Sequence, residues 1–430
     1  MLIEFRVKNY CCLRDEQVLS LVPSSDTSLL ESNTYETGVP SVPRLLRTAV
    51  IYGPNAGGKS TVLRAFQSML SMVIFSADLK KEHLLLPFPF LLDNTSREEP
   101  TAFELSFLYD GRRYQYGFSC ELNRILEEYL LEYSSARPTT LFQRHYDSES
   151  NKDVYTFSRS LRGPKNIWRD ATQHDVLFLS RAAQLNSEQL YPIWKYNFPA
   201  SIVFNKNLRP PLSVFLKQIL ESDELKKNIC EFLTAADISI KGIDIKKISQ
   251  PESDLKKLNI KNTPSIENSS EEEDKERYLL LFIHDTKQGD IMLPARMESE
   301  GTMHLFYYLT PLLSTLHLGT VLAIDELDAS LHPLLVRRVV EMFQSPQTNA
   351  HGAQLIFTTH DTTLLQAVGT LFRRDQVWFV EKNTDQASEL YSLAEFKRSK
   401  GESVERNYFQ GRYGGLPLLR DWEEVDGHGA

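Results

Sequence analysis

A glycine-rich stretch that ends in Lys-Ser-Thr is the part of the sequence whose residue types and spacing most clearly predict chemistry. The residues that match the pattern G-x-x-x-x-G-K-[ST] are Gly53, Pro54, Asn55, Ala56, Gly57, Gly58, Lys59, Ser60 and Thr61. Glycines let backbone N–H groups turn toward phosphate oxygens, and the N-terminus of a following helix adds a field that favours negative charge. The Lys59 ammonium can reach the β- and γ-phosphates, and the Ser60 hydroxyl can ligate Mg²⁺. The stretch therefore predicts a site for ATP and Mg²⁺.

Two adjacent carboxylates follow a short apolar run much later in the chain. The run at 321–324 is typical of a buried strand, and it ends at Asp325 and Glu326. Such a strand would bring Asp325 to the metal beside Ser60, and Glu326 would lie near the γ-phosphate and polarise the attacking water. A strand that ends in ordinary surface acids is the alternative interpretation. The phosphate loop elsewhere in the same chain favours the catalytic one.

Two further elements could contact phosphate. Ser299 can cap the helix that follows it, which would expose the backbone N–H group of Gly301 to an anion. A plain capping motif explains the same spacing. His360 ends the apolar strand predicted at 354–358, where its imidazole could donate a hydrogen bond to the γ-phosphate. A structural histidine is the alternative there.

Apolar periodicity predicts the elements that position these residues. Alternation at 3–7 and the runs at 101–109 and 112–120 indicate strands, and Asp110-Gly111 indicates a hairpin between the last two. From about residue 301 onward, helical and strand patterns alternate, which predicts a parallel sheet flanked by helices. The chain is therefore expected to have an α/β fold.

The long separation between Lys59 and Asp325 requires an inserted unit. We expect an N-terminal half of the nucleotide-binding unit at 1–135, a mostly helical insertion at 136–277, and a C-terminal half at 278–430. Residues 252–277 are acidic and poor in large apolar side chains, which predicts a mobile linker at the end of the insertion.

Composition sets the class of protein. With 430 residues, 41% hydrophobic and 24% charged, the chain has enough apolar material for a core, which excludes global disorder. A net charge of -9 argues against a surface that binds nucleic acid throughout, although a local basic patch remains open. The four cysteines lack metal-binding spacing, and the uncharged stretch at 305–324 is broken by Pro311 and Gly319. No signal peptide precedes the first strand, so a cytoplasmic protein without membrane spans is expected.

Together the motifs resemble the ABC-type ATPase heads of SMC, RecF and OLD (overcoming lysogenization defect) proteins. Within that group the sequence is most similar to the OLD-like ATPases of bacterial anti-phage, or abortive-infection, loci, such as RloA or PARIS-type ATPase subunits. In these proteins Ser299–Gly301 would be the signature element, Leu327–Pro333 the D-loop and His360 the switch histidine. The segments that carry the closer resemblance are 5–10, 298–302, 373–379 and 411–414. Cys11 stands where such ATPases often have arginine.

The resemblance implies a specific fold and mechanism. The fold would be that of a P-loop NTPase of ABC-ATPase head type, with a mixed sheet, an antiparallel N-terminal β subdomain and a mainly helical insertion. Two copies, or a higher homo-oligomer, would sandwich ATP between the phosphate loop of one copy and Ser299–Gly301 of the other. ATP would close the dimer and hydrolysis would reopen it.

The resemblance also implies a sensor and regulatory subunit that controls a separate effector in anti-phage defence. The chain after the strand at Trp378 is short and carries no nuclease constellation, so the effector would be a TOPRIM-type or other nuclease on another chain. A RecF- or SMC-like DNA-repair ATPase that binds DNA is the alternative, and it would use basic pairs such as 112–113, 246–247 and 397–398. A transporter ATPase subunit and a scaffold that binds ATP without hydrolysing it are further alternatives.

Overall fold

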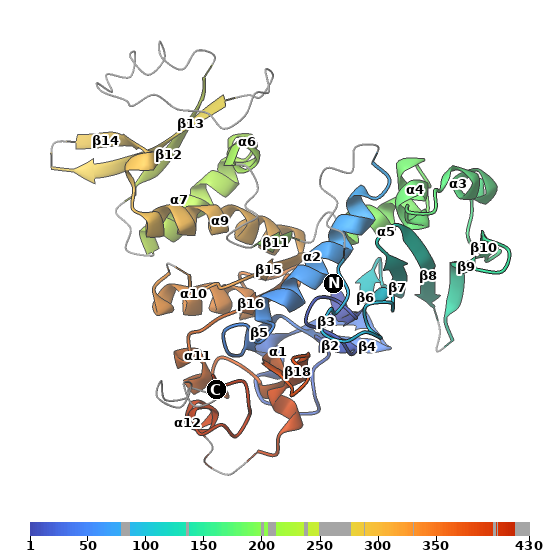
Figure 1. Cartoon of the computed structure of the whole chain (residues 1–430). Helices are drawn as coiled ribbons and strands as arrows, with labels where there is room; N and C mark the ends of the chain where they lie inside the picture. The colour runs from blue at the N-terminus through green and yellow to red at the C-terminus, as the bar shows by residue number, and fades with distance from the viewer. Residues whose placement is uncertain are drawn as a thin grey trace, which may run out of the picture. The chain divides into compact units, whose positions relative to one another are not determined.

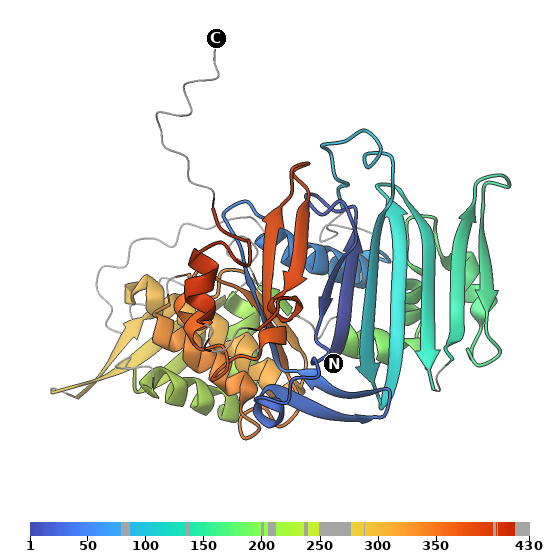
Figure 2. The same cartoon turned by 90° about the horizontal axis from the view of Figure 1, so that it is seen from below.

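The computed structural model forms two compact units, each described here by itself (Figures 1 and 2). The first unit comprises Met1–Lys206, Thr315–Ala329 and Val336–Ala430, and the second comprises Asn207–Ser314 and Ser330–Leu335. The structure describes residues 1–78, 87–134, 137–198, 202–204, 212–235, 240–248, 277–287, 289–329, 331–398, 401 and 403–417.

A six-stranded sheet lies at the centre of the first unit. In spatial order its strands are β11 (Ile202–Phe204), β15 (Val321–Ile324), β16 (Gln354–Thr358), β5 (Thr48–Tyr52), β17 (Val377–Lys382) and β18 (Ser388–Ser392). The first five strands run parallel, and β18 pairs antiparallel with β17. Every residue of β5, β15 and β16 is buried, as expected for parallel strands that are covered on both faces. The carboxyl ends of these three strands therefore meet at one edge of the sheet.

Besides a two-stranded sheet formed by β3 (Thr34–Val39) and β4 (Val42–Leu46), this unit has a second large sheet, which is antiparallel and seven-stranded. In spatial order its strands are β10 (Lys152–Phe157), β9 (Thr139–Asp147), β8 (Arg124–Tyr133), β7 (Arg112–Glu121), β6 (Thr101–Tyr109), β1 (Leu2–Lys8) and β2 (Gln17–Ser20). The predicted hairpin at Asp110-Gly111 joins β6 to β7, and both residues have positive φ, at 48° and 69°.

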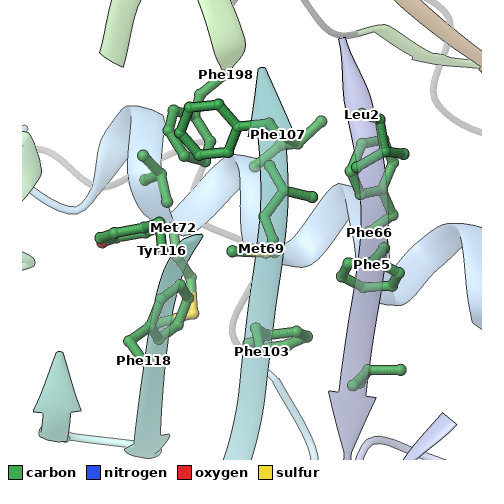
Figure 3. Packing of buried hydrophobic residues seen from close by; sticks show 14 of the residues in the cluster. Leu2, Phe5, Phe66, Met69, Met72, Phe103, Phe107, Tyr116, Phe118 and Phe198 are labelled. Atoms are coloured by element: carbon green, nitrogen blue, oxygen red, sulfur yellow. The ribbon is translucent and has the colours of Figure 1, made fainter. Parts of the chain in front are cut away.

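Helix α2 (Lys59–Phe75) contributes its apolar side chains to the main hydrophobic core (Figure 3). The rings of Phe66 on α2 and Phe5 on β1 meet edge to face, with their centroids 5.2 Å apart. Met69 and Met72 lie one and two turns further along the same helix and are also buried. Full burial of a side chain of this size contributes about 1.5–3 kcal/mol. The helix that begins at the phosphate loop is thus anchored along its length.

The other elements of the first unit are short. They are α1 (Leu30–Asn33), β3 (Thr34–Val39), β4 (Val42–Leu46), α3 (Lys165–Ala171), α4 (Phe178–Gln184), α5 (Leu190–Asn197), α10 (Pro333–Gln344, from Val336 on), α11 (Thr363–Gln366), η2 (Arg374–Gln376), η3 (Leu393–Glu395) and α12 (Val404–Phe409).

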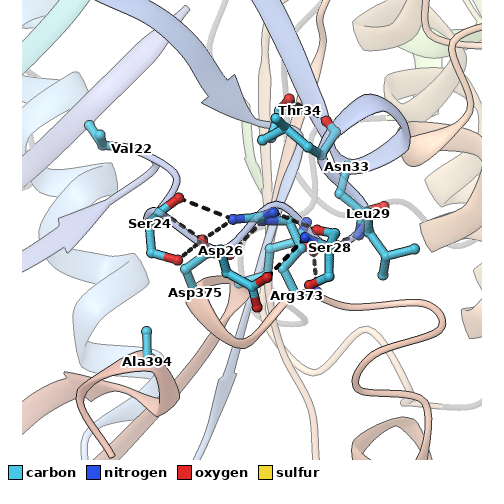
Figure 4. Close-up of polar contacts among 12 residues, drawn as sticks. Val22, Ser24, Asp26, Ser28, Leu29, Asn33, Thr34, Arg373, Asp375 and Ala394 are labelled. Atoms are coloured by element: carbon cyan, nitrogen blue, oxygen red, sulfur yellow. Dashed lines mark hydrogen bonds and ion pairs between the residues drawn. The ribbon is translucent and has the colours of Figure 1, made fainter.

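A buried arginine ties an N-terminal loop to the start of β17 (Figure 4). Arg373 is 1% exposed and pairs with Asp375, with 2.7 Å between Nη2 and Oδ2. Its Nη1 donates to the carbonyl oxygen of Ser28 at 2.5 Å. Asp375 in turn accepts hydrogen bonds from the backbone N–H and the hydroxyl of Ser24, both at 2.7 Å. The Arg-Arg-Asp-Gln segment noted in the sequence therefore has a structural role within this unit.

The second unit combines a small sheet with helices. Its elements are α6 (Leu212–Glu221), α7 (Asp223–Ala235), β12 (Gly242–Ile248), β13 (Arg277–Thr286), β14 (Gly289–Pro294), η1 (Ala295–Met297) and α9 (Glu300–Leu318, up to Ser314). The three strands pair antiparallel in the order β12-β13-β14. Phe282 on β13 packs edge to face against Phe306 on α9, with ring centroids 5.3 Å apart.

The structure confirms the predicted fold class, an α/β P-loop fold with an antiparallel N-terminal β region. The unit boundaries differ from the predicted division at 136 and 277, because the second unit begins at Asn207 and extends to Ser314. Between those predicted boundaries, β9 continues the antiparallel sheet by pairing with β8, its neighbour along the chain. Residues 252–276 of the predicted acidic linker lie outside the described residues, and Arg277 begins β13. Within the described part of the chain, no helix is both long and apolar enough to span a membrane.

Candidate nucleotide-binding and catalytic site

The phosphate loop connects β5 to α2 and depends on its glycines. Gly58 precedes α2 with a φ of 118°, and a methyl group there would press against the Ser388 side chain. A methyl group at Gly53 would collide with the backbone carbonyl oxygen of Val380, which cannot move out of the way without disturbing β17. Helix α2 begins without a hydrogen bond from a capping side chain. The N–H groups of Thr61 and Val62 donate to the Gly58 carbonyl, and phosphate oxygens can satisfy those of Lys59 and Ser60.

The side chain of Lys59, the first residue of α2, folds back over the phosphate loop. Its ammonium donates to the carbonyl oxygens of Gly53 at 2.7 Å and Pro54 at 3.1 Å. Burial lowers the pKa of Lys59, and the nearby carboxylates of Asp325, Glu326 and Asp328 partly oppose that shift. Phosphate oxygens would offer the buried ammonium stronger, charge-assisted hydrogen bonds than two neutral carbonyls do. The loop and its lysine thus fit the phosphates of a nucleoside triphosphate.

Ser60 and Asp325, predicted as metal ligands, are brought together. The Ser60 hydroxyl donates to Oδ1 of Asp325 at 3.0 Å, although the two residues are 265 positions apart. Among the described residues there is no group of three or more His, Cys, Asp or Glu side chains that could hold a metal ion. Mg²⁺ commonly binds through one or two carboxylates, with phosphate and water oxygens completing its shell. A hydroxyl and a carboxylate beside a phosphate loop fit that donor set.

Thr358, at the end of β16, is a site residue that the sequence interpretation missed. Its hydroxyl donates to Oδ1 of Asp325 at 2.7 Å and accepts from the backbone N–H of Glu326 at 2.7 Å. The register Ile324↔Phe357 places the residues that follow β15 beside the end of β16. A threonine at the end of an apolar strand, two residues before the predicted histidine, was the available signal.

Glu326 has a backbone conformation that is uncommon for a residue other than glycine. Its φ is 54°, in the left-handed region, and its N–H group is held by Thr358. Non-glycine residues in this region cost free energy and occur often at functional sites. The Thr358 hydroxyl therefore holds the main chain of the predicted catalytic residue Glu326. The same hydroxyl also bonds the predicted metal ligand, Asp325.

We expect Thr358→Val to keep ATP binding and to lower ATP turnover by about tenfold or more, because small displacements of catalytic groups have large effects on rate. Valine retains the shape of threonine but leaves the Glu326 N–H group and one Asp325 oxygen without the hydroxyl. Steady-state phosphate release measures the effect. The control is Thr320→Val just before β15, since the Thr320 hydroxyl has no hydrogen-bond partner among the described residues. Equal turnover in both variants would contradict the role of Thr358.

His360 follows β16 at the same edge of the sheet and is exposed. Its backbone N–H donates to Oδ2 of Asp328 at 3.1 Å, which fixes the main chain and leaves the imidazole facing solvent. The next residue is also held, because the Tyr52 hydroxyl at the end of β5 donates to the Asp361 carbonyl at 3.1 Å. The predicted histidine thus lies on a loop bonded to Asp328, in the segment predicted as the D-loop, and to the strand that precedes the phosphate loop.

Ser299 and Gly301 lie in the second unit, whereas the other predicted site residues lie in the first. The Ser299 hydroxyl accepts from the Thr302 N–H at 3.1 Å and bonds the Thr302 hydroxyl at 2.9 Å. Both contacts are those of a helix cap at the start of α9. Ser299 is exposed, and the Glu298 carboxylate beside it bonds His284 on β13 at 2.6 Å. The capping interpretation is confirmed for Ser299, and contact with an anion stays a prediction.

The residues described above fall within a known protein family. The family described as "AAA domain, putative AbiEii toxin, Type IV TA system" matches residues 49–366, a range that contains the phosphate loop, both carboxylates and His360. Among solved structures, the SMC head domain from Thermotoga maritima is similar at 11% sequence identity, over 91% of this chain and 98% of that chain, with a TM-score of 0.40. No curated protein matches the chain.

Proposed function

We propose that the chain, which belongs to the AAA-domain family of AbiEii-toxin type, hydrolyses ATP and uses that cycle to control a separate effector in anti-phage defence. One observation carries the catalytic part of this proposal. Ser60, Asp325, Thr358 and Glu326 come from three segments and are joined by hydrogen bonds of 2.7–3.0 Å. This arrangement suits a metal-assisted attack of water on a phosphoryl group, in which positioning and charge stabilisation supply most of the catalysis.

Each residue has a defined task in the proposed reaction. Lys59 would exchange its two loop carbonyls for β- and γ-phosphate oxygens and so orient the nucleotide. Ser60 and Asp325 would hold Mg²⁺, which when bound neutralises charge that develops on the phosphates. Glu326 would orient and polarise the attacking water, and the His360 imidazole would donate a hydrogen bond to the γ-phosphate.

We propose that ATP joins two copies of the chain, as a homodimer or within a higher homo-oligomer. The N-terminus of α9 in one copy would contact the γ-phosphate held by the other copy. An exposed, capped start to a 19-residue helix supports this role for Ser299 and Gly301, because a helix N-terminus favours anions. The closed form would then exist only while the γ-phosphate is present.

The proposed effector is a separate toxic protein, such as a TOPRIM-type or other nuclease, and the proposed compartment is the cytoplasm. The family description, which names a toxin and a toxin–antitoxin system, supports a defence role. The similarity of the sequence to OLD-like ATPases of anti-phage loci supports it further. An ATP-dependent dimer is a suitable sensor. If only the closed dimer binds the effector, an infection signal that changes the lifetime of the dimer also changes how much effector is bound.

The DNA-repair alternative predicts cationic surfaces, and the basic pairs named for it are partly neutralised. Arg112 is paired with Glu132, Lys246 with Asp244 at 3.5 Å, and Arg398 with Asp26 at 3.9 Å. A cation that is already paired with a carboxylate contributes less to phosphate-backbone binding. We therefore place effector control before DNA binding.

The proposal is tested by purifying the tagged chain together with the products of its neighbouring genes, with and without ATP. Wild type is compared with Glu326→Gln and Lys59→Met, and light scattering reports the size of each complex. We expect a stoichiometric partner whose retention differs between the two variants. If no partner co-elutes and DNA is bound in a salt-sensitive manner, the DNA-repair function replaces the one proposed.

A further inference from the structure

The C-terminal segment 411–415 of the first unit, Gly-Arg-Tyr-Gly-Gly, packs against the first glycine of the phosphate loop. A Cβ atom on Gly415 would lie 3.7 Å from Cα of Gly53 and 3.5 Å from the ring of Phe379 on β17. The backbone of residue 415 therefore lies directly against that of residue 53, with no side chain between them. Neither the sequence motif nor the proposed reaction accounts for this contact.

Three side chains from three different elements fasten the segment. The Gly415 N–H donates to Oε2 of Glu381 on β17 at 2.8 Å. The hydroxyl of Tyr391 on β18 donates to the Tyr413 carbonyl at 2.8 Å, and that of Tyr408 on α12 donates to the Gly415 carbonyl at 2.9 Å. Every bond involves the backbone of residues 413–415, so the path of the main chain is what the surroundings fix.

Stacked aromatic rings extend this contact to β5. Phe379 stacks on Tyr408 with 5.5 Å between ring centroids and on Tyr413 with 5.7 Å, at interplanar angles of 16° and 17°. Tyr408 also contacts Tyr52, the residue immediately before Gly53, with centroids 6.2 Å apart. Gly415 thus contacts Gly53, and Tyr408 on α12 contacts Tyr52, at the point where β5 passes into the phosphate loop.

Gly53 consequently packs against two segments. The Val380 carbonyl leaves no room for a side chain at Gly53, and Gly415 packs close to its Cα atom. The carbonyl oxygen of Gly53 accepts a 2.7 Å hydrogen bond from the Lys59 ammonium. A displacement of Gly53 would therefore move both the entrance of the phosphate loop and one of the groups that orient its lysine.

We propose that residues 413–415, fastened by Glu381, are a positioning element of the phosphate loop and set the affinity of the chain for nucleoside triphosphate. This inference rests on the proposed ATP-binding function and deepens it. The element contacts Gly53, β17, β18 and α12 rather than Ser60, Asp325 or Glu326, so the expected signature of its loss is a higher KM for ATP with kcat preserved.

Two glycines of the same segment give a matched pair of variants. Gly414 has a φ of 66°, and a methyl group there would collide with the Glu381 carboxylate and the Tyr391 hydroxyl. Gly411 has a φ of 74°, and no described atom lies within 4 Å of the methyl group that alanine would add. Both replacements cost similar backbone strain, but only Gly414→Ala disturbs the fastening.

The experiment measures ATP affinity by calorimetry, KM and kcat by phosphate release, and thermal unfolding for both variants. We expect Gly414→Ala to raise the Kd and KM for ATP by about tenfold, with kcat within about twofold, and Gly411→Ala to change neither constant by more than about twofold. If Gly414→Ala binds ATP as tightly as Gly411→Ala, the positioning role is wrong.

A milder variant protects the test against a folding failure. Tyr408→Phe keeps the stacked ring and loses only the bond to the Gly415 carbonyl, so we expect KM to rise about threefold without a change in kcat. An unchanged KM in that variant would contradict the proposal if Gly414→Ala does not fold. Wild type separates the two hypotheses: if it fails to bind ATP, the proposed function fails, whereas identical affinities across all variants remove only the positioning role.

Discussion

Glu326→Gln is expected to bind ATP with wild-type affinity and to lower kcat for hydrolysis by about 10²–10³-fold, the range typical of losing a group that acts only in the transition state. Glutamine has the shape of glutamate, so the left-handed backbone at φ 54° and the hydrogen bond from its N–H to Thr358 are retained. The amide cannot accept a proton from water. ATP would therefore stay bound, and the closed dimer would persist.

Single-turnover hydrolysis, ATP calorimetry and light scattering check this result together. Glu127→Gln is the matched control. Glu127 is an exposed glutamate on β8, which belongs to the antiparallel sheet and not to the sheet whose strand β5 precedes the phosphate loop. This control should match wild type in all three measurements. Normal turnover by Glu326→Gln would remove Glu326 from the proposed reaction. Loss of turnover without a longer-lived dimer would leave the catalytic role intact and contradict ATP-dependent closure.

The positions of the phosphate loop and of the two carboxylates at the ends of buried strands were predictable, because the signals for them are local in sequence. An apolar strand that ends at a glycine or an acid determines where the next side chains emerge, as at Gly53 and Asp325. Thr358 was not predicted, because its role depends on β16 lying between β15 and β5, and the order of strands in a sheet has no local signature.

Contacts between distant segments set the limit of prediction elsewhere too. Alternation identified strands such as β6 and β7 with their hairpin, because side-chain direction in a strand follows the sequence directly. The division into units depends on which strands pair. Residues 139–147 were expected in the insertion, but they form β9, which pairs with β8 in the antiparallel sheet. The Gly-Arg-Tyr-Gly motif was visible in the sequence, but the contact of the next residue, Gly415, with Gly53 joins segments that are far apart in the chain.

Lys59→Met is expected to weaken ATP binding by about a hundredfold, or about 3 kcal/mol, the loss expected when charge-assisted hydrogen bonds to two phosphates are removed. Methionine keeps an apolar stem of similar length, so the buried position at the start of α2 remains filled. The variant loses the ammonium that the carbonyls of Gly53 and Pro54 hold at 2.7 and 3.1 Å. Calorimetry with ATP measures the change, and Lys8→Met, at an exposed ion pair with Glu99, controls for the loss of one positive charge.

The pH dependence of binding gives a second, independent test of Lys59. Burial lowers the pKa of the Lys59 ammonium in the free protein, and bound phosphates would raise that pKa by adding negative charge. Between the free and bound pKa values, ATP binding must take up a proton, so the affinity of wild type should fall as pH rises through the alkaline range. Lys59→Met has no such proton to take up, and its weaker affinity should vary less with pH. Parallel pH profiles for the two proteins would mean that Lys59 does not contact the phosphates.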